Sequence, residues 1–291
     1  MKIRWSRVAP QVALMPAVAV TLTAFAGAVL WTIYISFTNS KRFPDYAMTG
    51  MKQYFRLFND ELWIRSLQNM LILGFGSLAS IVLGFILAAL IDREVRGEGI
   101  FRTVFLYPLA VSLIVTGIVW RWLFNPSVGV ESFFHSIGWN WVHFNWLASP
   151  QTVMYGIILA SVWQSTGFFM ALMLAGLKGI NPEIWRAAKL DGVSFWRLYF
   201  EIIIPMMKLT FVTCVILLSI GVVKAYDFVV AMTNGGPGGS SFVPAYFAIN
   251  AYWLKENLGY ASAAAAMMLL FTVVLFLPFL LSAVVRRRNA G

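Results

Sequence analysis

Six long apolar stretches constrain this chain more than any other feature of its sequence. A helix crosses the hydrocarbon core of a membrane with about 20 apolar residues, because the core is about 30 Å thick and each residue rises about 1.5 Å. The stretches cover residues 12–37, 68–91, 103–124, 152–177, 206–232 and 261–285. We therefore expect an all-α integral membrane protein with six transmembrane helices, organised as a single transmembrane domain over residues 1–291.

The composition agrees with this expectation. Hydrophobic residues make up 60% of the 291 residues, charged residues make up 12%, and the mean hydropathy is +0.76; these values are outside the range of a water-soluble domain. The net charge of +10 comes without a clustered basic patch. We therefore expect contact with the lipid bilayer and none with nucleic acid.

Lysine and arginine predict how the helices are oriented, because these residues accumulate on the cytoplasmic side of short loops. With both termini in the cytoplasm, the inner segments hold fourteen of them and the outer segments six. Five of those six lie in the first outer loop, which weakens the contrast, whereas the second outer loop, residues 125–151, has none. We expect a multi-pass protein of the bacterial cytoplasmic (inner) membrane with both termini inside. The inner residues are Lys2, Arg4, Arg7, Arg93, Arg96, Arg102, Lys178, Arg186, Lys189, Arg197, Lys208, Arg286, Arg287 and Arg288.

The longest inner connection contains a short helix with well-made ends. Asn181 is a favourable N-cap, Pro182 suits the first helical position, and Glu183 complements the positive end of the helix dipole. Gly192 ends the helix. Its mixture of apolar and charged residues is typical of a protein-docking surface, but it also suits an interfacial helix that lies against lipid headgroups.

Residues 182–205, PEIWRAAKLDGVSFWRLYFEIIIP, resemble the EAA loop of ABC importer permeases, in which two alanines, an Asp-Gly pair and a later Ile-x-x-Pro recur at fixed spacing. Other stretches resemble the carbohydrate-importer branch of these permeases, specifically its MalF-like subunit. They are WRWLFNPSVG (120–129), NWLASP (145–150), AGLKGINPE (175–183) and MTNGGPGGSSF (232–242).

The resemblance implies the type I importer permease fold, with a coupling loop at about residues 178–205 that docks on a cytoplasmic ATPase. It implies four partners: a second homologous permease, two ATP-binding-cassette ATPase subunits and an extracytoplasmic solute-binding protein. Small residues in GYASAAAAMM (259–268) suit either the contact with the second permease or internal packing. The chain has no G-x-x-x-x-G-K-[ST] sequence, so we expect no enzymatic activity and no cofactor, with ATP and Mg²⁺ held by the ATPases.

The EAA match assigns the coupling residues one by one. Arg186 stands where the motif usually has a glutamate, which puts in doubt any contact that needs a carboxylate there; Glu183, one turn away on a similar face, is the substitute. Small alanines allow close approach, and glycine supplies a turn that a Cβ would resist. The expected coupling residues are Glu183, Arg186, Ala187, Ala188, Asp191 and Gly192.

Polar residues follow one face of the fourth apolar stretch. Ser161, Gln164, Ser165 and Phe168 are spaced at i, i+3, i+4 and i+7. Hydroxyl, amide and aromatic groups together suit a sugar, although serine and glutamine also link neighbouring helices by hydrogen bonds. In the family that the sequence resembles, this face contacts the transported sugar, a mono- or oligosaccharide.

Two opposite charges, Lys224 and Asp227, interrupt the fifth apolar stretch. Three residues apart on one helix, they lie on adjacent turns of one face. They either neutralise each other, as paired intramembrane charges do, or contact the substrate, as the resemblance implies for these positions.

Two other functions remain open at this point. An ion-gradient-driven secondary transporter would have internal repeats, discontinuous helices or rows of intramembrane carboxylates. A permease for glycerol phosphate or a polyol would belong to the same ABC class, but an anionic substrate favours more than the single deep cation, Lys224. His135 and His143 have no partner at metal-ligand spacing, so we expect them to be surface residues and expect no metal site.

Overall fold

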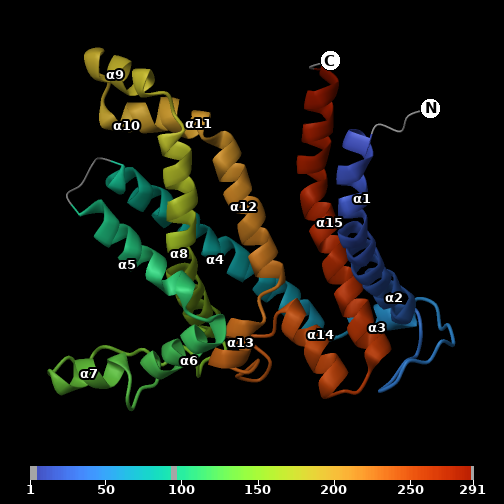
Figure 1. Cartoon of the computed structure of the whole chain (residues 1–291). Helices are drawn as coiled ribbons and strands as arrows, with labels where there is room; N and C mark the ends of the chain where they lie inside the picture. Colours follow the sequence, from blue (N-terminus) through green and yellow to red (C-terminus); the bar gives the residue numbers. More distant parts are fainter. Residues whose placement is uncertain (1–4, 93–96, 290–291) are drawn as a thin grey trace. The chain divides into compact units, whose positions relative to one another are not determined.

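The computed structural model describes residues 5–92 and 97–289, with side chains over 13–92 and 97–277. Within these ranges the regular secondary structure is helical, as Figure 1 shows, with no strand and one isolated bridge between Thr38 and Met48. The all-α prediction is confirmed. Several residues counted for the orientation lie outside the described residues or side chains, namely Lys2, Arg4, Arg7, Arg93, Arg96 and Arg286, Arg287 and Arg288.

The helices, in chain order, are α1 (Trp5–Thr21), the π-helical η1 (Leu22–Ala26), α2 (Gly27–Ser36), α3 (Lys52–Phe58), α4 (Glu61–Ile91), α5 (Glu98–Ala110), α6 (Leu113–Leu123), α7 (Val130–Ser136), α8 (Val153–Lys178), α9 (Pro182–Leu190), α10 (Phe195–Arg197), the π-helical η2 (Leu198–Ile203), α11 (Ile204–Met206), α12 (Lys208–Val223), α13 (Asp227–Met232), α14 (Pro244–Trp253) and α15 (Leu258–Asn289).

Four of the expected spans are single helices in the described chain. The segments long and apolar enough to cross a membrane are Ala13–Ser36, Glu61–Ile91, Val153–Lys178 and Leu258–Leu277. The third span, 103–124, was expected as a continuous helix, and this is wrong, because Glu98–Ala110 and Leu113–Leu123 meet at a bend of 97°. The bend of 70° between Phe195–Met206 and Lys208–Val223 lies at the start of the expected fifth span, 206–232. The described chain therefore has up to six spans, two of which are broken.

The third span breaks for a local reason. Pro108 lies inside α5, where it removes one backbone donor and crowds the preceding turn. The helix ends two residues later, and Val111 and Ser112 take extended backbone conformations with ψ values of 136° and 140° before α6 begins.

The helix of the fifth apolar stretch, which was expected to be continuous, ends at Lys224. This residue is the C-cap of α12, and Asp227 is the first residue of α13. The expectation that both lie on one helical face is therefore wrong. A cation at a helix C-terminus and an acid in the next first turn both complement the helix dipoles, so their charges favour a break at this point.

The described residues form two compact units, one of residues 62–92, 97–246 and 278–289, and the other of residues 5–61 and 247–277. The single-domain organisation stays a prediction. In the larger unit, α8 contacts α5, α6, α12 and α13 (Figure 1). A Cβ on Gly167 of α8 would overlap the carbonyl oxygen of Phe105, so glycine is required where α5 crosses α8.

The smaller unit contains the small residues that begin the sixth span. Ala263 and Ala264 are fully buried, which favours internal packing for them over a surface for a second permease. Beside them, the hydroxyl of the buried Tyr260 donates a hydrogen bond to Asp60 over 2.8 Å, and the Arg56 guanidinium lies 4.5 Å from the centre of its ring.

Candidate functional site

A cavity of about 610 Å³ lies in the larger unit. It is formed by α4, the break between α5 and α6, α8, and the connection between α12 and α13. Its size lies within the usual range of small-molecule sites. All six residues expected to bind substrate line it, namely Ser161, Gln164, Ser165, Phe168, Lys224 and Asp227. The fold thus brings together two groups that are about sixty residues apart in sequence.

Gln164 has a clear structural role in this cavity. Only 5% of the residue is exposed, its Oε1 accepts a hydrogen bond from Thr116 Oγ1 over 2.8 Å, and its Nε2 donates to the carbonyl oxygen of Val111 over 2.9 Å. Val111 is at the break between α5 and α6. Gln164 therefore supplies the donor that the interrupted helix lacks, and its amide is occupied by the protein itself.

The other three residues of the α8 face are more accessible. Ser161, Ser165 and Phe168 are half-buried, and the Ser165 hydroxyl donates to the carbonyl oxygen of Ser161 over 2.7 Å. A hydroxyl that donates inside its own helix still has lone pairs to accept a hydrogen bond. These side chains leave two hydroxyl groups and one aromatic ring at the cavity wall.

Lys224 and Asp227 do not neutralise each other directly. Among the described side chains no ion pair includes either residue. Lys224 is exposed and Asp227 is half-buried. Both charges are therefore accessible to a molecule in the cavity.

Three polar lining residues are not among the residues that the sequence assigned to the site. Ser77 of α4 and Ser112 at the α5–α6 break line the cavity, as does Tyr226, whose ring stacks on Tyr246 with centroids 6.0 Å apart. The Ser77 hydroxyl is buried and has no hydrogen-bond partner among the described residues. Two sequence signals for these residues were available: Ser77 interrupts an apolar run, and Ser112 follows Pro108 by four residues.

The short helix of the expected coupling loop, α9, has the ends that the sequence predicts. Asn181 Oδ1 accepts a hydrogen bond from the backbone N–H of Glu183 over 3.0 Å. Ile184 and Trp185 pack against the apolar core of the larger unit, and the Trp185 ring meets the buried Tyr199 ring edge-on at 6.0 Å. This packing explains why a nine-residue helix persists, since an isolated helix of that length is marginal.

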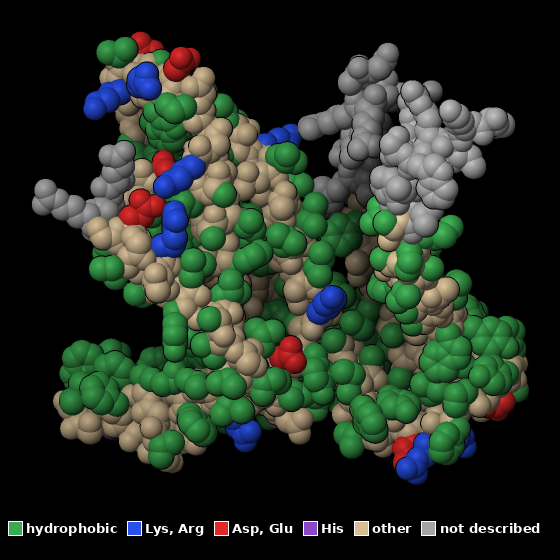
Figure 2. All heavy atoms as spheres, viewed as in Figure 1, with side chains coloured by type: hydrophobic (Ala, Val, Ile, Leu, Met, Phe, Trp, Pro, Cys, Tyr) green, Lys and Arg blue, Asp and Glu red, His purple; other side chains and the backbone are tan. Residues whose placement is uncertain are grey.

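The opposite face of α9 is open. Only Ala188 of the expected coupling residues is buried, while Leu190 is 88% exposed. Figure 2 shows charged side chains of both signs gathered over the end of this unit that carries α9 and α10. Gly192 has a φ of +65°, the left-handed conformation that favours glycine. The exposed coupling residues are Glu183, Arg186, Ala187, Asp191 and Gly192.

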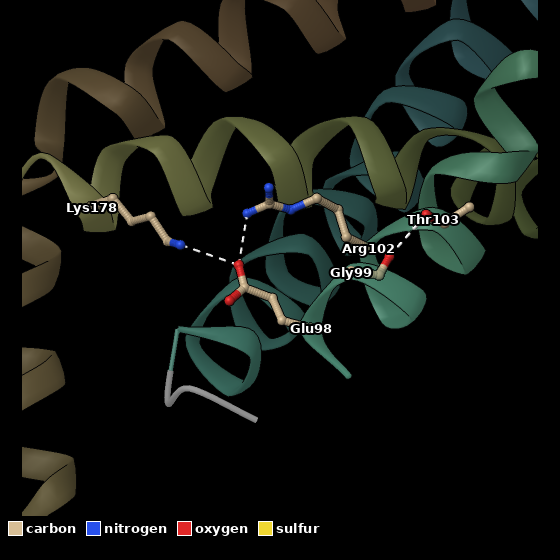
Figure 3. Close-up of polar contacts among 5 residues, drawn as sticks. All are labelled: Glu98, Gly99, Arg102, Thr103 and Lys178. Carbon is tan, nitrogen blue, oxygen red and sulfur yellow. Dashed lines mark hydrogen bonds and ion pairs between the residues drawn. The ribbon is translucent and has the colours of Figure 1, made fainter. Parts of the chain in front are cut away.

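Lys178, at which the expected coupling loop begins, belongs to a small ion-pair network. Figure 3 shows one carboxylate oxygen of Glu98, at the start of α5, between Arg102 and Lys178, at the end of α8. The Glu98 Oε1 distances are 2.9 Å to Arg102 Nη2 and 3.2 Å to Lys178 Nζ. Because these side chains are partly exposed, the pairs contribute little stability, but they link α5 to the C-terminus of α8.

Residues of the 125–151 loop meet in a way that the sequence did not predict. His143 Nδ1 lies 3.1 Å from Oε1 of the buried Glu131, and His135 Nε2 lies 3.1 Å from the carbonyl oxygen of Val142. His143 is exposed, as expected of a surface residue, and His135 is half-buried. The expectation that they have no partner at metal-ligand spacing is wrong, because ligand atoms of Glu131, His135 and His143 lie within 4.8 Å of one another.

Comparison with known proteins identifies the family. The model of the binding-protein-dependent transport system inner membrane component matches residues 80–289. The chain belongs to this family. It is therefore a multi-pass inner membrane protein and a transport component, which confirms the resemblance to ABC importer permeases. The discontinuous helices expected of a secondary transporter are present, but the family excludes that class.

Individual relatives extend the match over most of the chain. A probable ABC transporter permease of Pyrococcus horikoshii is 38% identical, covering 87% of this chain and 88% of its own. The trehalose/maltose transport system permease protein MalF of Thermococcus litoralis is 30% identical, covering 90% and 88%. The bacterial alginate ABC transporter, solved in complex with an alginate pentasaccharide-bound periplasmic protein, has a TM-score of 0.79 at 20% identity, covering 95% of each chain. The fold is that of an ABC importer permease.

Proposed function

We propose that this chain is the permease subunit of an ABC importer that moves a sugar into the cytoplasm by alternating access. The observation that carries the proposal is the cavity of about 610 Å³, in which hydroxyls, an aromatic ring and two accessible charges meet. Hydroxyl and charged groups bind the hydroxyl edges of a sugar, and a ring such as that of Phe168 packs on its C–H faces. The two sugars in the name of the Thermococcus relative, trehalose and maltose, support this substrate class.

The charge of the cavity favours a neutral sugar over glycerol phosphate. Among the described lining residues, those that carry a charge at neutral pH are Lys224 and Asp227, so the side-chain charges sum to zero. A phosphate group would gain one contact with a cation and meet the repulsion of a carboxylate in the same space. A neutral mono- or oligosaccharide uses both groups as hydrogen-bond partners.

The energy for transport comes from outside this chain. The open face of α9 docks on an ATP-binding-cassette subunit, which holds ATP and Mg²⁺, and a second copy of that ATPase pairs with a second permease. This chain itself has no enzymatic role and holds no cofactor. A solute-binding protein delivers the sugar, as the periplasmic protein in the alginate complex suggests. In this arrangement α9 and both termini face the cytoplasm.

Transport by the reconstituted complex tests the proposal. The two permeases and two ATPases are placed in proteoliposomes with the binding protein, and uptake is measured for neutral mono- and disaccharides, an acidic oligosaccharide and glycerol 3-phosphate. We expect uptake of a neutral sugar that requires ATP and continues when ionophores remove ion gradients. Preferred uptake of glycerol 3-phosphate, or uptake that an ionophore abolishes, contradicts the proposal.

A further inference from the structure

We propose that Glu131, His135 and His143 form a binding site for one Zn²⁺ ion in the 125–151 loop. One ligand atom from each residue lies within 4.8 Å of the others. Two imidazole nitrogens and a carboxylate oxygen are ligands that Zn²⁺ prefers, and three protein ligands leave the fourth tetrahedral position to water. The site is separate from the sugar cavity, none of whose lining residues belongs to this loop.

The local helix places two of the ligands on one face. Glu131 and His135 are four residues apart on α7 (Val130–Ser136), a spacing that brings side chains together one turn apart. His143 approaches from the returning segment of the loop. An ion bound by all three residues therefore links α7 to the segment that follows it.

The separation of two ligand atoms already suits a shared metal ion. With metal–ligand distances of about 2.0–2.1 Å, two ligands of a tetrahedral zinc ion are about 3.3 Å apart. Nδ1 of His143 and Oε1 of Glu131 are 3.1 Å apart. The His143 side chain is 70% exposed, so it can rotate to complete the site without displacing packed neighbours, and a neutral ring then carries its proton on Nε2.

The surrounding hydrogen bonds orient the other two ligands. The carbonyl oxygen of Val142 can only accept, so Nε2 of His135 carries the proton, and Nδ1 of the neutral ring keeps its lone pair. A histidine ligand whose second nitrogen donates to a carbonyl is the usual arrangement around a metal. The second oxygen of Glu131 accepts from the backbone N–H of Phe144 over 2.9 Å, which fixes the carboxylate.

The burial of Glu131 supplies an independent reason. Only 7% of this residue is exposed, and a carboxylate withdrawn from water requires a compensating charge or a metal ion. The exposed His143 compensates it only while the imidazole is protonated. A bound Zn²⁺ compensates it while both imidazoles are neutral and act as ligands, and it fixes the loop conformation.

Metal analysis of the assembled transporter, purified without a polyhistidine tag, tests the site. After dialysis against Zn²⁺ and then metal-free buffer, we expect the wild-type complex to retain one more Zn²⁺ than a complex with H135Q and H143Q. Replacement by Co²⁺ is expected to give the visible absorption of tetrahedral cobalt only in the wild type. Equal metal content in both complexes, or an octahedral cobalt spectrum, overturns the proposal.

Two single variants keep the test decisive if the double variant fails to assemble. H143N removes an exposed ring and is expected to weaken Zn²⁺ binding by at least about tenfold. S136A, an exposed position on the same helix, is expected to bind Zn²⁺ as the wild type does. Unchanged affinity in H143N shows that the cluster is an ion pair only.

Discussion

Thr116 Oγ1 donates a hydrogen bond to Oε1 of Gln164 over 2.8 Å, which joins α6 to the centre of α8. Together with the bond from Gln164 Nε2 to Val111, it holds the 97° bend between α5 and α6 beside the cavity. The residue that the sequence suggested for sugar binding thus shapes the site.

Replacing Gln164 by alanine is expected to destabilise the protein by about 2 kcal/mol, because it leaves the Val111 carbonyl and the Thr116 hydroxyl without their partner. Thermal unfolding of the purified complex measures this loss. The control is S165A, which removes a hydroxyl from the same cavity but only a bond within α8. Equal stability of both variants would mean that Gln164 does not hold the bend.

Replacing Gly167 by alanine is expected to separate α5 from α8, because the new Cβ would overlap the Phe105 carbonyl oxygen. We expect a loss of at least about 1–3 kcal/mol, as for other overpacked interiors. The matched control is G221A: Gly221 of α12 also lines the cavity, but a Cβ there meets nothing within 4 Å. Wild-type stability of G167A would contradict the close approach of the two helices.

Replacing Gly192 by valine is expected to impair coupling while insertion persists. At a φ of +65° a side chain with a Cβ costs roughly 1–2 kcal/mol, so the population of the docking conformation falls by about fivefold or more. Sugar uptake per ATP hydrolysed is the measurement. G192N is the control, since asparagine tolerates this conformation. Undiminished coupling in G192V would remove Gly192 from the coupling loop.

Replacing Lys224 by methionine leaves the Asp227 charge alone in the cavity. Because a hydrogen bond to a charged group contributes about 1.5–3 kcal/mol, we expect the concentration of neutral sugar needed for half-maximal uptake to rise by at least about tenfold. K41M changes an exposed loop lysine outside the cavity and controls for the change in net charge. An unchanged uptake curve for K224M would exclude Lys224 from the substrate site.

Acid is expected to loosen the 125–151 loop when a chelator is present. The backbone N–H of Phe144, and then His143, hold the pKa of Glu131 below its ordinary value of 4.5. A lowered pKa in the folded state stabilises the loop above about pH 4.5, and this contribution disappears as the pH falls through the folded-state pKa. Hydrogen exchange at residues 142–144 measures it. E131Q should lack the acid-induced increase in exchange; if it keeps the increase, another group is responsible.

Much of the membrane architecture could be predicted from sequence because hydrophobicity and helix length are local properties. The break between α5 and α6 and the break between α12 and α13 could have been partly predicted as well. Pro108 precedes the first by a few residues, and the order of Lys224 before Asp227 matches the charges of a helix end followed by a helix start. An apolar stretch long enough to span nevertheless predicts a continuous helix when only its length and hydropathy are considered.

The sequence could not predict which group each polar side chain contacts in the folded protein. Periodicity placed Ser161, Gln164, Ser165 and Phe168 on one face, but it gave no reason to separate Gln164 from the others. That distinction depends on the Val111 carbonyl, which is 53 residues away. In the same way, Ile184 and Trp185 belong to the mixture of apolar and charged residues that suggested a docking surface, but the structure packs both against the core of the larger unit.

The sequence by itself determined that the chain is a helical membrane protein, which segments are apolar enough to span, and which loop carries the coupling motif, because these follow from residue type and spacing along one helix. Only the tertiary structure decided which polar groups are free to bind a ligand and which are used internally. Hydrogen bonds and ligand clusters such as Glu131 with His143 depend on distances between segments, and these distances are set by packing and broken helices.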